Sequence, residues 1–115
     1  MGITRSRGLA GEALAAEFLK LAGYRIEASN VRIGGVEVDI VASDGPTQVL
    51  VEVKFRSRSD YGGAAAAIDG AKRTRLRRAA GVVAGTGAPV RIDVITIELE
   101  AEGAVLRHYR NALRE

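Results

Sequence analysis

Two runs of alternating residues lie close together in the first half of the chain and restrict what it can fold into. Residues 36–41 read Val-Glu-Val-Asp-Ile-Val, and residues 49–55 read Val-Leu-Val-Glu-Val-Lys-Phe. Each run is apolar at one parity and partly charged at the other, which is typical of a β-strand with one face against a core. The charged positions are Glu37 and Asp39 on the first strand and Glu52 and Lys54 on the second.

The segment between the two runs predicts how the strands pair. Residues 43–48, Ser-Asp-Gly-Pro-Thr-Gln, are rich in turn formers and indicate an antiparallel hairpin. With Ala42 paired to Val49, Asp39 falls opposite Glu52. A shift of one residue would mix the apolar and charged faces, so the pattern favours this register.

The same register brings charged side chains together, and two interpretations of them stay open. Directly opposed residues have Cβ atoms roughly 4.5–5.5 Å apart, so Asp39 and Glu52 can hold one divalent cation between them. Glu37 falls opposite Lys54. The alternative is therefore the solvent-exposed face of a sheet, with Glu37 and Lys54 as a cross-strand ion pair.

Length and composition bound the class of protein. A chain of 115 residues that is 47% hydrophobic has the size of a single globular domain, residues 1–115. The net charge of +3 is mildly basic, so only the distribution of charge is informative about partners. The absence of cysteine excludes disulfides and cysteine-based zinc sites and permits a cytoplasmic location. No apolar run reaches about 18 residues, so we expect no membrane span.

The pattern along the chain predicts helices and strands in the order α-β-β-β-α-β-β. We expect a mixed central β-sheet flanked by helices, in the α/β or α+β class. The expected helices are Ser6 to Ala22, stopped by Gly23, and Ala64 to Ala84. The expected strands are residues 24–31, 36–41, 49–55, 90–98 and 104–109.

The first expected helix carries a glutamate at the edge of its apolar side. Glu12 projects close to the line of Ala16 and Leu19 and can look along the sheet. The alternative is a first-turn glutamate that is favoured by the helix dipole. The apolar arc of this helix is expected to comprise Leu14, Ala15, Phe18, Leu19 and Ala22.

The second expected helix is rich in basic residues. Lys72, Arg75 and Arg78 lie three apart and form a basic stripe along one side. Arg56 and Arg58 follow directly after the second alternating strand. Such a distribution suits contact with the phosphate backbone of a nucleic acid, whereas the alternative is a solvated helix face. Aromatic residues are only 4% of the chain, so backbone contact is favoured over base stacking.

Several chemistries have no support in the sequence. The single histidine, His108, sits near the C-terminus, and we interpret it as a surface residue rather than as part of a catalytic triad. No phosphate-binding loop of the Walker type is present. Gly85-Thr86-Gly87 is best explained as the loop that ends a helix.

One pattern resembles the metal-binding core of the PD-(D/E)xK nuclease superfamily: Asp39 is followed, after twelve intervening residues, by Glu52-Val53-Lys54. A closer similarity, to the small bacterial YraN-like family of uncharacterised proteins, covers nearly the whole chain. The segments that carry it are Gly11-Glu12, Gly23-Tyr24, Asn30-Val31-Arg32, Glu37-Val38-Asp39, Val51-Glu52-Val53-Lys54-Phe55-Arg56, Lys72, Arg91-Ile92-Asp93-Val94 and Asn111-Ala112.

The resemblance implies a restriction-endonuclease-like core, as in Holliday-junction resolvases, and roles for named residues. Asp39 and Glu52 would ligate Mg²⁺ or Mn²⁺, with the Val53 carbonyl as a third ligand. Glu12 would complete the site from the first helix. Lys54 would orient the attacking water or help to deprotonate it. We therefore expect a metal-dependent endonuclease that acts on branched or single-stranded DNA.

The same resemblance implies how DNA would be held. Residues that would contact the phosphate backbone are Arg56, Arg58, Lys72, Arg75 and Arg78. Resolvase-like enzymes are often dimers, so a homodimer is one expected state. A second hypothesis is a non-catalytic nucleic-acid-binding module, because Val38 stands where the superfamily often has a proline before the metal-binding aspartate. A third is a structural, dimer-forming protein without nucleic-acid affinity.

Overall fold

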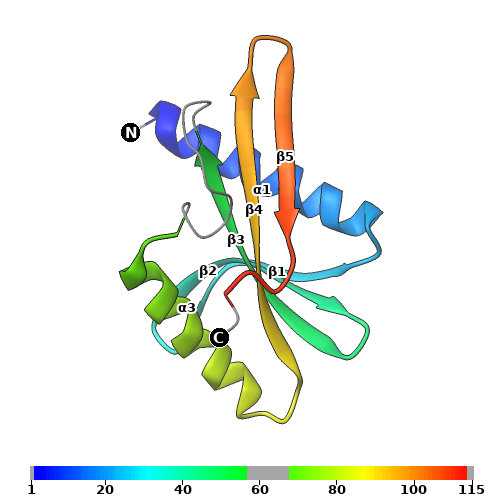
Figure 1. The fold of residues 1–115 in the computed structure, drawn as a ribbon, viewed down its shortest axis with the longest axis vertical. Coiled ribbons are helices and arrows are strands. Elements are labelled where there is room, and N and C mark those ends of the chain that lie inside the picture. The colour runs from blue at the N-terminus through cyan, green and yellow to red at the C-terminus, as the bar shows by residue number, and fades with distance from the viewer. Residues whose placement is uncertain (1, 57–67, 114–115) are drawn as a thin grey trace.

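The fold follows the expected order of helices and strands. The computed structural model describes residues 2–56 and 68–113, with side chains from residue 10 onward. Its class is α+β with one mixed sheet, as predicted. The elements are α1 (Gly2–Leu21), β1 (Arg25–Ile33), β2 (Val36–Asp44), β3 (Thr47–Arg56), α3 (Gly70–Ala84), β4 (Val90–Glu100) and β5 (Gly103–Tyr109) (Figure 1).

The described strands form a five-stranded sheet in the order β1-β2-β3-β4-β5. Neighbouring strands are antiparallel except β3 and β4, which pair in parallel from Gln48↔Val90 to Arg56↔Glu98. A parallel pair needs a crossover connection, and α3 lies on that connection. β3 is therefore the middle strand, and its residues 49–52 are buried.

The two helices in the described part of the chain, α1 and α3, cover opposite faces of the sheet. On one face Ala15 and Leu19 of α1 share a core with apolar residues of β2, β3 and β4. On the other face Leu76 and Ala79 of α3 share a core with the opposite parity of β3 and β4. Figure 1 shows β4 running from beside the end of α3 to the tip of the β4–β5 hairpin. Neither α1 nor α3 carries the uninterrupted apolar length that a bilayer crossing requires.

The packing of α1 differs from the expected apolar arc. Leu14 is 45% exposed and Ala22 is also exposed, so neither belongs to the buried stripe. The helix instead contacts the sheet through Gly11, Ala15 and Leu19, spaced four apart. The small residue at position 11 allows a close approach, because a Cβ there would lie 2.6 Å from the Phe55 ring.

The helix boundaries also differ from the prediction. α1 begins at Gly2 rather than Ser6, and it ends before Gly23 as expected. α3 begins at Gly70 rather than Ala64. The cause is Asp69, whose extended backbone and side chain cap the helix by accepting a 2.8 Å hydrogen bond from the Lys72 backbone N–H. Residues 64–67 lie outside the described residues.

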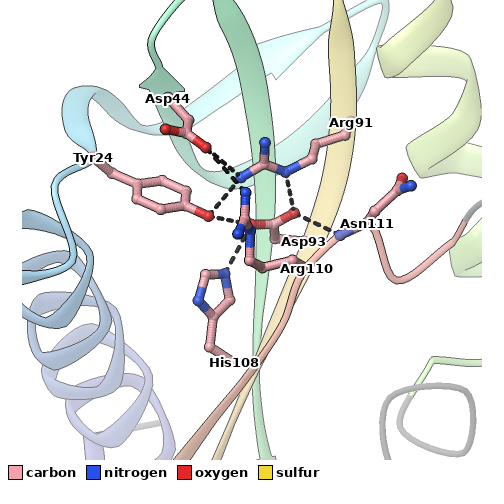
Figure 2. A network of polar contacts seen from close by, with 7 residues as sticks. All are labelled: Tyr24, Asp44, Arg91, Asp93, His108, Arg110 and Asn111. Atoms are coloured by element: carbon pink, nitrogen blue, oxygen red, sulfur yellow. Dashed lines mark hydrogen bonds and ion pairs between the residues drawn. The ribbon is translucent and has the colours of Figure 1, made fainter.

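A buried carboxylate, Asp93 on β4, collects donors from several elements (Figure 2). Its side chain is 0% exposed. Oδ1 accepts hydrogen bonds from Arg91 Nε at 3.0 Å and from the Asn111 backbone N–H at 2.9 Å. Oδ2 lies 2.8 Å from His108 Nε2 and accepts from the Tyr24 hydroxyl at 3.2 Å. Asp93 thus joins β4, β5, the C-terminal turn and the α1–β1 junction.

The interpretation of His108 as a surface residue is wrong. Its side chain is 10% exposed. The ring lies edge-to-face against Phe18 and Tyr24, with centroids 5.7 and 5.6 Å away. His108 is therefore a structural partner of Asp93, and position along the chain could not reveal this, because the contact joins residues from distant segments.

The network extends to the β2–β3 turn. Arg91 donates a hydrogen bond to the Tyr24 hydroxyl and lies 3.2 Å from Asp44 Oδ2, which Arg110 also contacts at 3.2 Å. Burial raises the pKa of Asp93, but the hydrogen bonds from His108, Asn111 and Arg91 outweigh it and hold the pKa below 3.8. The charged form of this carboxylate is therefore the stable one in the fold.

Replacing Asp93 by Asn should lower the free energy of unfolding by about 3 kcal/mol at pH 7, because an amide cannot satisfy four donors around a buried position. The matched control is Asp44→Asn, at a carboxylate that is 38% exposed, where we expect about 1 kcal/mol or less. Urea denaturation followed by circular dichroism measures both. Equal losses in the two variants would contradict the importance of burial.

The stability difference between the parent protein and Asp93→Asn should depend on pH in one direction. Since the folded-state pKa of Asp93 lies below the unfolded value of 3.8, its stabilising contribution is complete above that pH. The contribution is lost as the pH falls through the folded-state pKa. The difference between the parent protein and Asp93→Asn should therefore shrink only below about pH 4.

Candidate functional site

The predicted hairpin register is confirmed, and it ends where the candidate site begins. Ala42 pairs with Val49, and the pairing continues to Ile40↔Val51. Beyond that pair β2 continues alongside β1, and β3 continues alongside β4. The two strands therefore separate immediately before Asp39 and Glu52.

The alternation along β2 also changes at this point, which sequence analysis did not foresee. Val36 and Val38 pack in the core on the α3 face. Ile40 and Ala42 have the same parity in the sequence but pack in the core on the α1 face. Asp39 thus lies at a reversal of the side-chain pattern, between the two faces of the sheet.

Where the pairing of β2 with β3 has ended, the side chain of Asp39 replaces the backbone acceptor for one N–H group of β3. Its Oδ2 accepts a 2.8 Å hydrogen bond from the Val53 backbone N–H. This contact holds the carboxyl in the opening between β2 and β3. The expected neighbour relation of Asp39 and Glu52 is present, and their carboxyls are close enough that each influences the pKa of the other.

Glu52 is a carboxylate with too few partners. The residue is only 5% exposed. Its Oε2 lies 3.3 Å from Lys72 Nζ, while its buried Oε1 finds no hydrogen-bond donor within the described part of the chain. The lysine that pairs with it therefore comes from α3.

The electrostatics of the carboxyl pair favour a positive partner. Burial, and after it the charge of Asp39, raise the pKa of Glu52 from 4.5 to about 7, although Lys72 opposes the rise. Burial also raises the pKa of Asp39 above 3.8, and the hydrogen bond from Val53 and the charge of Lys72 offset only part of that effect. A cation between the two groups would relieve both the repulsion and the desolvation.

Glu12 approaches this region from α1, on the opposite face of the sheet. It is half-buried, and its Oε1 accepts a 2.8 Å hydrogen bond from Asn30 Nδ2 on β1. Burial raises the pKa of Glu12 above 4.5, the hydrogen bond from Asn30 opposes this, and the charges of Asp39 and Glu37 add to the rise. The charges of Asp39 and Glu37 thus act on Glu12 across the sheet.

A small polar cavity lies on the α3 side of Glu52. Its volume is about 200 Å³. Lys54 lines it from β3, so the expected proximity of Lys54 to Glu52 is present, and the Lys54 side chain is exposed. The lining residues are Glu52, Lys54, Ile68, Asp69, Lys72 and Arg75.

The fit of these residues to a divalent cation rests on the carboxyl pair. Within residues 2–56 and 68–113, no three acidic or histidine side chains form a ready cluster of ligands. Asp39 and Glu52 still match the preference of Mg²⁺ and Mn²⁺ for oxygen, because one carboxylate oxygen of Glu52 is buried without a donor. Glu12 is held by Asn30, and the charge of Asp39 acts on it.

The predicted phosphate-binding residues fall into three groups. Lys72 and Arg75 line the cavity, and Lys72 also pairs with Glu52. Arg78 is exposed on α3, and Arg56 is half-buried at the end of β3. Arg58 lies outside the described residues. Sequence reasoning missed two contacts at the candidate site: that of Asn30 with Glu12 and that of Lys72 with Glu52.

The class of protein can now be stated from its fold and site. It is an α+β domain in which a mixed sheet opens between two strands at a pair of carboxylates, one buried and one half-buried, beside lysines. The chain belongs to the uncharacterised protein family UPF0102, which is the YraN-like family and whose sequence profile matches residues 11–97.

Individual relatives extend the similarity over most of the chain. A UPF0102 protein of Symbiobacterium thermophilum is 44% identical over 105 residues, which cover 88% of this chain and 89% of that protein. One from Mycolicibacterium vanbaalenii is 43% identical over 96 residues, covering 80% and 79%. One from Xanthomonas axonopodis pv. citri is 38% identical over 115 residues, covering 96% and 93%. The suspected family is thereby confirmed.

Replacing Glu52 by Gln should stabilise the protein above neutral pH. The folded protein binds a proton at Glu52 more tightly than the unfolded chain, so stability falls as the pH rises from 4.5 to about 7 and is then level. At pH 8 the glutamine variant should gain on the order of 2 kcal/mol in free energy of unfolding, and at pH 5 it should gain little.

Urea denaturation at the two pH values measures this effect without any added metal. Glu17→Gln is the matched control, because Glu17 is exposed and pairs only with Lys20 in the described contacts. It should change the stability by less than about 0.5 kcal/mol at either pH. A loss of stability in Glu52→Gln at pH 8 would contradict the proposed burial of an unfavourable charge.

Proposed function

We propose that this protein is a metal-dependent endonuclease that hydrolyses phosphodiester bonds in DNA, either branched or single-stranded. The observation that carries the proposal is the pair of the half-buried Asp39 and the buried Glu52, placed where two strands separate and next to a cavity lined by lysines. Acidic ligands for a cation and basic groups for a phosphate are thus neighbours. Acidic and basic groups in this combination suit phosphoryl chemistry better than a purely structural role.

Some residues of the site would bind the cation, and others would contact the substrate. Asp39 and Glu52 would hold Mg²⁺ or Mn²⁺, with the Val53 carbonyl and Glu12 as further oxygen ligands. When bound, the cation would stabilise the negative charge that develops on the phosphate and make water more acidic. The Glu52 carboxylate, which binds a proton up to about pH 7 by itself, would be ionised in that state.

Lys54 and Lys72 act on the phosphate side of the same cavity. The exposed ammonium of Lys54 can contact the scissile phosphate and orient a water molecule toward it. Lys72, whose side chain is 29% exposed, neutralises Glu52 and can reach a phosphate from the same position. Both amines supply positive charge where the reaction builds up negative charge, which lowers the barrier.

The exposed basic side of α3 supports a contact with the nucleic-acid backbone. Arg75 lines the cavity, and Arg78 lies three residues farther along the helix and is exposed. A backbone that passes over these two residues would place one of its phosphates at the cavity. This arrangement favours recognition through phosphates rather than through base edges.

The cleavage of branched and single-stranded DNA in Mg²⁺ or Mn²⁺ tests the proposal directly. Asp39→Asn and Lys54→Ala should each lower the cleavage rate by about 10²-fold or more, because each removes a group that acts on the developing charge. The matched controls are Glu17→Gln and Lys20→Ala, which break an exposed ion pair on α1. The controls should cleave at the parental rate.

Two outcomes would separate the proposal from its alternatives. Cleavage that survives unchanged in Asp39→Asn shows that a contaminant is responsible. DNA binding without cleavage, insensitive to metal and to Asp39→Asn, favours a non-catalytic nucleic-acid-binding module instead.

Charge reversal on α3 tests how DNA is held. Arg75→Glu combined with Arg78→Glu should weaken DNA binding by about 10-fold or more at 0.1 M salt and reduce the slope of log K against log salt by about 2. The control is Lys20→Glu combined with Arg25→Glu, which changes the net charge equally at exposed positions on α1 and β1. Equal weakening by both pairs would indicate that only the net charge matters. Fluorescence anisotropy over a salt series provides the measurement.

A further inference from the structure

Asn30 adopts a backbone conformation that is unusual within a strand. Its φ is +53°, in the left-handed region that residues other than glycine rarely occupy. Its neighbours Ser29 and Val31 pair regularly with Ile40 and Val38 of β2, so no chain reversal accounts for this value. Strained residues that persist inside regular structure are often found at functional sites.

Asn30 lies next to two acidic residues of the candidate site, one on β2 and one on α1. Because Ser29 pairs with Ile40 and Val31 pairs with Val38, Asn30 lies opposite Asp39 across the β1–β2 pair. Its side chain points to α1, where Nδ2 donates the 2.8 Å hydrogen bond to Glu12 Oε1. Asn30 thus stands between the carboxyl of the helix and the strand that carries the carboxyl pair.

The chemistry of this contact suits a carboxylate that must also serve another partner. An amide donor fixes one oxygen of Glu12 and leaves the other oxygen of that carboxylate available. A lysine in its place would hold Glu12 more strongly but would repel a divalent cation nearby. Hydrogen bonds of this kind orient the ligands of metal sites in proteins.

We infer that Asn30 is a positioning residue that holds the Glu12 carboxylate toward Asp39, so that Glu12 serves as an additional ligand of the cation. This inference rests on the proposed function, because it assumes that a cation binds at Asp39 and Glu52. The left-handed conformation of Asn30 is then part of the site: it turns the amide toward α1 at the point where the alternation of β2 reverses.

A purely structural role makes a different prediction. If residue 30 only had to accept a positive φ, glycine would serve equally well, since it has no Cβ to clash. Asn30→Gly therefore keeps the backbone conformation and removes only the amide. Asn111 offers a matched control, because it also has a positive φ, of +51°, in the C-terminal turn. Asn111→Gly makes the same change away from Glu12, Asp39 and Glu52, and it keeps the backbone N–H that Asn111 donates to Asp93.

The experiment measures Mn²⁺ affinity by titration calorimetry and thermal stability without metal for the full chain and both variants. Asn30→Gly should bind Mn²⁺ about 10-fold to 100-fold more weakly than the parent, with its metal-free melting temperature unchanged or raised. Asn111→Gly should bind Mn²⁺ as the parent does. Equal Mn²⁺ affinity in Asn30→Gly and the parent overturns the inference and leaves the metal site intact.

A reciprocal exchange gives a second test of the contact itself. Glu12→Gln alone should weaken Mn²⁺ binding by removing a carboxylate. Combining it with Asn30→Asp restores the hydrogen bond with donor and acceptor exchanged and returns one carboxylate to the site. The double variant should bind Mn²⁺ more tightly than Glu12→Gln, and failure to do so overturns the inference. If the parent protein binds no Mn²⁺ at all, the proposed function and this inference both fail.

Discussion

The carboxylate of Asp93 is the interaction on which the arrangement of the elements depends. A charge that is 0% exposed costs several kcal/mol unless it is paired and hydrogen-bonded. Its partners come from β4, β5, the C-terminal turn and the α1–β1 junction, so these segments must be in place together before the charge is satisfied. Through Arg91 and Asp44 the same network reaches the β2–β3 turn. One end of the sheet is therefore fixed, and the opening between β2 and β3 lies away from that turn.

The two buried acidic regions have opposite electrostatic characters. Asp93 has more donors than its burial requires, and its pKa lies below 3.8. Glu52 has one ion pair and one oxygen without a donor, and burial raises its pKa to about 7. Residues of the same chemistry thus serve different ends: a saturated carboxylate holds a structure together, whereas an undersupplied one marks a place where a ligand would lower the free energy. This contrast is a stronger guide to the candidate site than the number of acidic residues.

Local patterns in the sequence were enough to predict the order of the elements and the register of the β2–β3 hairpin. Ala42 and Val49 flank a short turn, and a wrong register would have exposed the apolar parity. The reversal of alternation at Asp39 was not predictable, because no pattern in β2 records it; it coincides with the left-handed backbone of Asn30 on the neighbouring strand. For a similar reason, His108 was wrongly predicted to be a surface residue, and the ion pair of Lys72 was not predicted. Their partners, Asp93 and Glu52, are set by how the sheet brings distant segments together, and no periodicity records that.

The parallel pairing of β3 with β4 places a condition on when the site exists. Every acidic residue and lysine assigned to the site lies within the first 72 residues, yet β3 is flanked on one side by a strand that starts at Val90. During synthesis, a nascent chain whose site residues have already emerged from the ribosome still lacks β4, the strand that pairs with β3 and helps to bury Glu52. The buried environment of Glu52 would thus form only after β4 has been synthesised, and shorter nascent fragments would carry the same residues without that environment.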